Sequence, residues 1–152
     1  MDEAKSTFQR IQTLLERAND PSVDDFIRSH LAQLICVMGS GAIEVACQRV
    51  LANHSGKTAS VQTARYAKKQ LGGFQNPNPK KIKELFSAFD ENWGAKLDAY
   101  WLGEVKDSVG SLVGNRHLIS HGKNTNVTLA QVKPWIKCAE QLCRKLEEIV
   151  GK

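Results

Sequence analysis

The residues best suited to chemistry lie in the stretch GNRHLISHG, from Gly114 to Gly122. It holds Arg116, His117 and His121, so two of the four histidines of the chain lie close to an arginine. An imidazole can take the proton of a ribose 2′-OH or protonate a leaving 5′ oxygen, and a guanidinium stabilises charge on phosphate. This set suits phosphoryl transfer on RNA. The alternative is a polar helix end whose histidines interact favourably with the helix dipole.

Helical spacing makes Arg116 unusual among these residues. Steps of three or four residues lead from Leu112 to Arg116 and then Ile119, so Arg116 lies on an apolar stripe and points toward packed surface. A buried guanidinium needs an anion, carbonyl acceptors or a ligand. Arg116 and His121 are separated by about 140° around an ideal helix. They therefore meet over one target only across a cleft, or where two copies of the helix each supply half a site.

Metal and thiol chemistry have little support. The spacing of His117 and His121 would need a third ligand to hold zinc, and no acidic residue or cysteine lies beside them. We expect no metal and no cofactor. The cysteines form no CxxC pair and lie among apolar residues of predicted helices, which indicates buried, reduced thiols. They are Cys36, Cys47, Cys138 and Cys143.

Positive charge is concentrated in one segment. The chain has a net charge of +5, and residues 55–83 contain seven basic residues and no acidic one. Four of these lysines are candidate RNA-binding residues, namely Lys68, Lys69, Lys80 and Lys81. A basic face that binds phosphates is one interpretation, and a solubilising surface is the other.

The bulk properties favour one soluble domain over residues 1–152. A length of 152 residues, 41% hydrophobic and 24% charged, is ordinary for a globular protein. We expect no apolar run long enough to cross a bilayer, and MDEAKSTFQR does not resemble a signal peptide. These features predict a cytoplasmic protein that does not enter a membrane.

Periodicity and capping residues predict an all-α chain of about six helices. Asp20 and Pro21 suit the start of the second helix, Asn78 and Pro79 that of the fourth, and Thr128 to Gln131 has capping-box spacing. The second and fifth helices form the expected spine. The expected ranges are 3–18, 21–53, 58–71, 79–90, 93–120 and 128–150.

Some residues disturb these helical patterns. Gly39 and Gly41 in the second helix predict a kink or a close approach of another helix. Pro134 is far inside the last helix, so that helix begins later or bends there. The only hint of a strand is a couple of residues around Val127.

The run Arg116-His117-Leu118-Ile119-Ser120-His121 resembles the signature of HEPN domains, which is an arginine, a polar residue, three variable residues and a histidine. The position at the end of a long helix also agrees. WLGEVKDSV and KCAEQLCRKLEEI are most similar to the RiboL-PSP-HEPN branch. His117 departs from the pattern, because asparagine is more usual at that position.

The resemblance implies a HEPN-like bundle with two long central helices. Many HEPN proteins are metal-independent ribonucleases of toxin, abortive-infection or CRISPR systems, in which motif residues of two copies converge at a dimer interface. Arg116 would bind phosphate and His121 would act as acid or base, with His117 and Asn115 in support. The implied partners are RNA, a second copy joined through this helix, and an antitoxin or companion protein. Other HEPN members are inactive modules that bind RNA, a nucleotide or a protein.

Overall fold

The computed structural model describes residues 3–123 and 125–151, and this part of the chain contains seven α-helices and no strand. The class is therefore all-α, as predicted, and the strand hint around Val127 is wrong. The helices are α1 (Glu3–Ala18), α2 (Asp25–Thr58), α3 (Val61–Leu71), α4 (Pro79–Phe89), α5 (Glu91–Tyr100), α6 (Glu104–Ser120) and α7 (Leu129–Val150).

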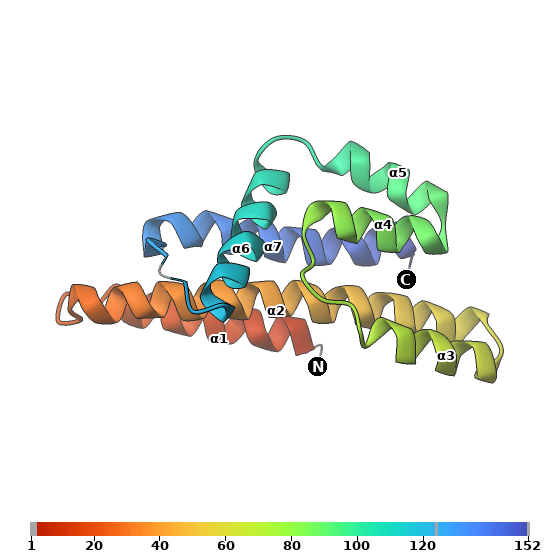
Figure 1. Cartoon of the computed structure of the whole chain (residues 1–152), viewed down its shortest axis with the longest axis horizontal. Helices are drawn as coiled ribbons and strands as arrows, with labels where there is room; N and C mark the ends of the chain where they lie inside the picture. The colour runs from red at the N-terminus through yellow and green to blue at the C-terminus, as the bar shows by residue number, and fades with distance from the viewer. Residues whose placement is uncertain (1–2, 124, 152) are drawn as a thin grey trace.

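The long helix α2 is the spine of the bundle, with α7 as its main partner (Figure 1). α1 packs along the first part of α2 and α3 along its last part, while α6 crosses both α2 and α7. α4 and α5 form a pair that reaches α7 through α5. The core draws on nearly every helix, including the fully buried Ile11, Ile43, Phe86, Leu112 and Leu142.

The predicted fifth helix is in fact two helices, which is why the described chain has seven. Gly103 adopts a φ of +65° between α5 and α6, in the region that favours glycine. The apolar stripe continues across this break, because Leu97 and Trp101 before it and Val109 after it are all buried. The prediction that the fifth helix is a second spine is therefore wrong, and α7 takes that place.

The second helix begins later than predicted. Asp24, not Asp20, is its N-cap, and the Asp24 carboxylate accepts from the Ile27 N–H at 2.9 Å. Asp20 instead accepts from the N–H and hydroxyl of Ser22, which closes a turn. Arg28 stabilises that turn by donating to the carbonyls of Ala18 and Asp20. Either aspartate could cap a helix locally, and these tertiary contacts decide between them.

Other local predictions are confirmed. Asn78 caps α4, and Thr128 and Gln131 form the capping box of α7. α7 therefore begins where the capping box predicts, with Pro134 inside it.

The two glycines of α2 differ. A Cβ on Gly39 would lie 2.5 Å from Ile136 Cδ1 and 3.0 Å from Leu112 Cδ2, whereas a Cβ on Gly41 would meet nothing within 4 Å. Gly39 therefore marks the predicted close approach of α6 and α7 to α2.

α2 is long and apolar enough to cross a membrane by length and composition, so the expectation that no segment reaches this limit is wrong. Its most apolar window has a mean hydropathy of 1.5, and half of that window is buried in the bundle. Core helices of globular proteins also have these properties. α2 also carries exposed apolar side chains, including Phe26 and Leu34.

Candidate active site at the end of helix α6

The guanidinium of Arg116 is half-buried and points toward the segment that links α3 to α4. Arg116 Nη1 donates to Asn76 Oδ1 at 3.1 Å. Asn76 has a φ of +54°, in the left-handed region that asparagine tolerates better than most residues. The predicted orientation of Arg116 toward packed surface agrees with this contact.

Glu44 of α2 is the acidic neighbour of Arg116. Burial raises the pKa of Glu44, and the Arg116 guanidinium and the Asn76 backbone N–H partly oppose that rise. We call Glu44, Asn76 and Arg116 the arginine cluster. It gives the half-buried guanidinium one amide acceptor, Asn76 Oδ1, and a carboxylate close enough to interact with it electrostatically.

The two histidines of the motif form a separate pair. The rings of His117 and His121 lie with centroids 4.4 Å apart at 63°, an edge-on arrangement, and both residues are exposed. Their spacing of four residues places them on one face of α6. Both rings can therefore be reached by a molecule that binds from solvent.

The position of His121 is set by the way α6 ends. His121 is the C-cap, and Gly122 follows with a φ of +70°. The Gly122 N–H donates to the Ile119 carbonyl at 3.0 Å, and the Lys123 N–H donates to the Leu118 carbonyl at 2.9 Å. This is the Schellman pattern, in which glycine reverses the chain after the cap. The glycine cap therefore fixes His121 at the C-terminal end of α6.

Asn115 lies apart from both groups. Its side-chain amide donates to the Ser111 carbonyl at 2.8 Å, within α6. The structure thus gives Asn115 a hydrogen bond along the helix rather than to Arg116 or a histidine. Its supporting role remains a prediction.

The four lysines named from sequence are all exposed and lie at two helix ends. Lys68 and Lys69 are in the last turn of α3, whereas Lys80 and Lys81 are in the first turn of α4. Asn76, the partner of Arg116, precedes Lys80 by only four residues. Within the basic segment, the lysines at the start of α4 are therefore the ones nearest in sequence to the arginine cluster.

In one copy of the chain, the motif is divided between two surroundings. Arg116 donates to Asn76 and interacts electrostatically with Glu44, while His117 and His121 contact each other at the surface.

Within the described residues, no group of three His, Cys, Asp or Glu side chains is placed to hold a metal ion. None of the four cysteines forms a disulfide in the described structure, three of them are buried, and burial raises the pKa of Cys36 to about 11.

Sequence reasoning missed Glu44 and Asn76. Glu44 is the only acidic residue between residues 26 and 58, so a single carboxylate inside a largely apolar helix was the available signal. Asn76 lies in FQNPNP, where its role depends on a contact with a residue 40 positions away. Nothing in the local pattern indicates that contact.

Comparison with known proteins identifies the family of the chain. The family model described as RiboL-PSP-HEPN matches residues 2–152. No match was found among curated proteins or among solved structures. The match covers nearly the whole sequence and agrees with the all-α bundle. The chain is therefore a HEPN domain of the RiboL-PSP-HEPN family.

Proposed function

We propose that this HEPN domain is a metal-independent endoribonuclease of the toxin or defence type, acting in the cytoplasm at a site completed by a second copy. The observation that carries the proposal is the division at the end of α6. A guanidinium is fixed by the fold on one side, and two imidazoles face solvent on the other. These are the charge-stabilising and proton-transferring groups that RNA cleavage requires.

Arginine and histidine side chains of the two copies suffice for the reaction. Neutral His121 takes the proton of the ribose 2′-OH, and the 2′ oxygen attacks the adjacent phosphorus. The bond from phosphorus to the 5′ oxygen breaks, and a protonated imidazole, from His117 or from the second copy, gives that oxygen its proton. Arg116 stabilises the charge on the phosphate oxygens. The products carry a 2′,3′-cyclic phosphate and a 5′-OH.

A second copy is supported by the outer face of α2. This face carries exposed apolar side chains, with Phe26 71% and Leu34 47% exposed, and the Phe26 ring lies against the His30 ring with centroids 4.3 Å apart. The spacing of its members places them along one side of the helix. They are Phe26, Leu34, Val37, Gly41 and Val45.

The outer face borders the motif. Glu44 lies between Gly41 and Val45 on α2 and interacts electrostatically with Arg116, so this face reaches the arginine cluster. Leu118 on α6, 43% exposed, extends the apolar surface toward the histidines. A two-fold axis through this region would bring two histidine pairs together and bury the exposed leucines.

An inactive binding module is the second candidate. Asn76 and Glu44 give Arg116 a purely structural reason to be present, since Asn76 accepts a hydrogen bond from the guanidinium and Glu44 offers it an opposite charge. Such a module would hold RNA, a nucleotide or a protein without cutting RNA.

For the enzyme, an antitoxin or companion protein is the further partner that we propose.

The test compares wild type with His121→Ala on tRNA and on a structured RNA, with and without EDTA. We expect EDTA-resistant cleavage with cyclic-phosphate ends, and a loss of roughly 10²–10⁴-fold in His121→Ala because the acid–base group is removed. His117→Asn, which places the more usual residue there, identifies the acid: activity falls if His117 protonates the 5′ oxygen and is kept if the second copy does. Circular dichroism checks the fold of each variant.

Two results contradict the proposal. One is a pure wild-type protein that cuts neither RNA. The other is cleavage that persists in His121→Ala. Salt-dependent RNA binding without cleavage, unchanged in His121→Ala, would favour the binding module.

A further inference from the structure

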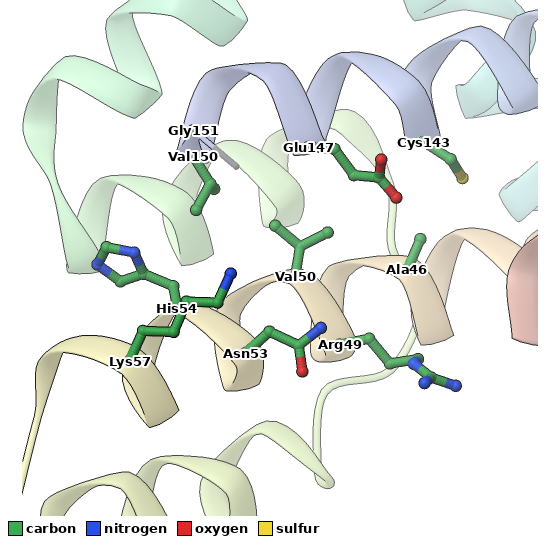
Figure 2. Close-up of a pocket in the computed structure, with 10 residues that line it drawn as sticks. All are labelled: Ala46, Arg49, Val50, Asn53, His54, Lys57, Cys143, Glu147, Val150 and Gly151. Carbon is green, nitrogen blue, oxygen red and sulfur yellow. The ribbon is translucent and has the colours of Figure 1, made fainter. Parts of the chain in front are cut away.

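A groove lies between the C-terminal halves of α2 and α7, away from the motif (Figure 2). Its volume is about 450 Å³, within the range of roughly 300–1,000 Å³ common for small-molecule sites. The α2 side is formed by residues 46–57, whereas α6 meets α2 around Cys36 and Gly39. The groove and the motif thus use different parts of the same helix.

The middle of the groove is apolar. Val50 points up from α2 and Val150 points down from α7, and Ala46 continues the apolar lining along α2 (Figure 2). The valines are only half-buried, so part of their surface is open to a ligand. A largely apolar body would fit against them.

The two sides of the groove carry opposite charges that do not meet. Lys57 extends its ammonium from α2 into the space between the helices, and Glu147 extends its carboxylate from α7 (Figure 2). Among residues 3–123 and 125–151, neither side chain forms an ion pair within 4.0 Å or a hydrogen bond. Each is therefore available to a bound molecule.

The other polar residues of the lining complete the pattern. Asn53 lies one turn from Lys57 on the same face of α2, so its amide can add a donor beside the ammonium. Arg49 is already paired with Glu3 at 3.4 Å, which leaves Lys57 as the unpaired cation of the lining. The His54 ring is held by an edge-on contact with Trp93, with centroids 4.9 Å apart, and forms one wall.

We propose that this groove binds a small phosphate monoester whose body carries hydroxyl or amino groups. The phosphate accepts from Lys57 and Asn53, because its terminal oxygens can take several donors at once. The body crosses Val50 and Val150, and its hydroxyl or amino groups donate to the Glu147 carboxylate. The site is independent of the RNA cleavage proposed for the α6 motif.

The probe is uridine 5′-monophosphate, which has the anion, the body and the hydroxyl groups, compared with uridine and with inorganic phosphate. Binding is measured by calorimetry and by the shift in Tm. We expect the monophosphate to bind and to raise the Tm, and each fragment to bind about tenfold more weakly or worse, which is about 1.4 kcal/mol. Lys57→Gln and Glu147→Gln should each weaken the monophosphate by about tenfold.

Two matched variants locate the site. Lys68→Gln removes another exposed lysine, on α3, and Arg116→Ala disables the motif, so both should leave binding unchanged if the groove is the site. Binding lost in Arg116→Ala would overturn the proposal, because the ligand would then occupy the motif. Three further results would overturn it. The monophosphate does not bind at millimolar concentration, inorganic phosphate binds as tightly as the monophosphate, or Lys57→Gln binds the monophosphate as tightly as wild type does.

Discussion

On one side of the α6 C-terminus, the Arg116 guanidinium is half-buried and held by Asn76, with Glu44 nearby. On the other side, the rings of His117 and His121 are exposed and contact only each other in the described structure. The first side is thus organised by the fold of one chain. On the second side, the fold fixes the backbone at the His121 C-cap and at Gly122, while the two rings remain exposed.

This difference shows which side a second copy would need to complete. A guanidinium in a fixed place loses little side-chain entropy when phosphate binds, whereas exposed imidazoles gain a defined environment only from a partner surface or from RNA. The outer face of α2 next to the motif offers such a surface. The following predictions test each side in turn.

The largest effect is expected on the side open to solvent, from Leu34→Asp. A charge in the centre of the outer face should prevent association of two copies, because it would be buried without a partner. If the site is composite, cleavage should fall as far as in His121→Ala, by about 10²-fold or more. Sedimentation gives the mass, and the cleavage assay gives the activity.

Val61→Asp is the control for Leu34→Asp. Val61 is 81% exposed and lies at the start of α3, outside the outer face of α2. Val61→Asp should change neither the mass measured by sedimentation nor the cleavage activity. A Leu34→Asp protein that remains as large and as active as wild type would sink the two-copy site.

A smaller effect is expected on the side held by the fold, from Asn76→Gly. Glycine accepts the positive φ of this position, but the substitution removes the side-chain amide oxygen that accepts from Arg116. We expect kcat/KM for RNA to fall by about tenfold, since a misplaced catalytic group can cost up to about 10²-fold. Asn76→Asp keeps an acceptor oxygen and should lose less activity.

The stability of the Asn76 variants separates positioning from folding. If Asn76→Gly lowers kcat/KM while its Tm stays near that of wild type, the amide acts through Arg116. Equal activity in Asn76→Gly and wild type would show that the cleavage reaction does not depend on how Asn76 orients Arg116.

Local signals account for the parts of the fold that sequence reasoning predicted. The caps at Asn78 and Thr128 involve neighbours three residues away, so their residue types alone indicate where α4 and α7 begin. The break at Gly103 was not predictable in this way. Periodicity reports which face of a helix is buried, and that face continues from α5 into α6.

The candidate site divides along the same line. Arg116, His117 and His121 lie on one helix, so spacing alone separates the arginine from the histidine pair. Glu44 and Asn76 come from α2 and from the segment before α4, and they reach Arg116 only after α2, α4 and α6 pack together. Their contribution depends on tertiary structure that no local pattern encodes.

The smallest effect concerns the charge balance within the arginine cluster. Burial raises the folded pKa of Glu44 above its ordinary value of 4.5. Between these two pKa values, the folded state binds more protons than the unfolded state, so the free energy of unfolding falls as pH rises through that window. Glu44→Gln should remove this contribution to the pH dependence.

Arg116→Gln changes the same balance in the opposite direction. The guanidinium lowers the pKa of Glu44, so its loss should raise that pKa further and extend the destabilising window to higher pH. Carboxyl NMR titration of Glu44 in wild type and Arg116→Gln measures the change, with the exposed Glu16 as a reference that should not move. An unchanged Glu44 pKa would mean that the guanidinium exerts no electrostatic effect on the carboxylate. Asn76 would then be the one partner that holds Arg116 in place.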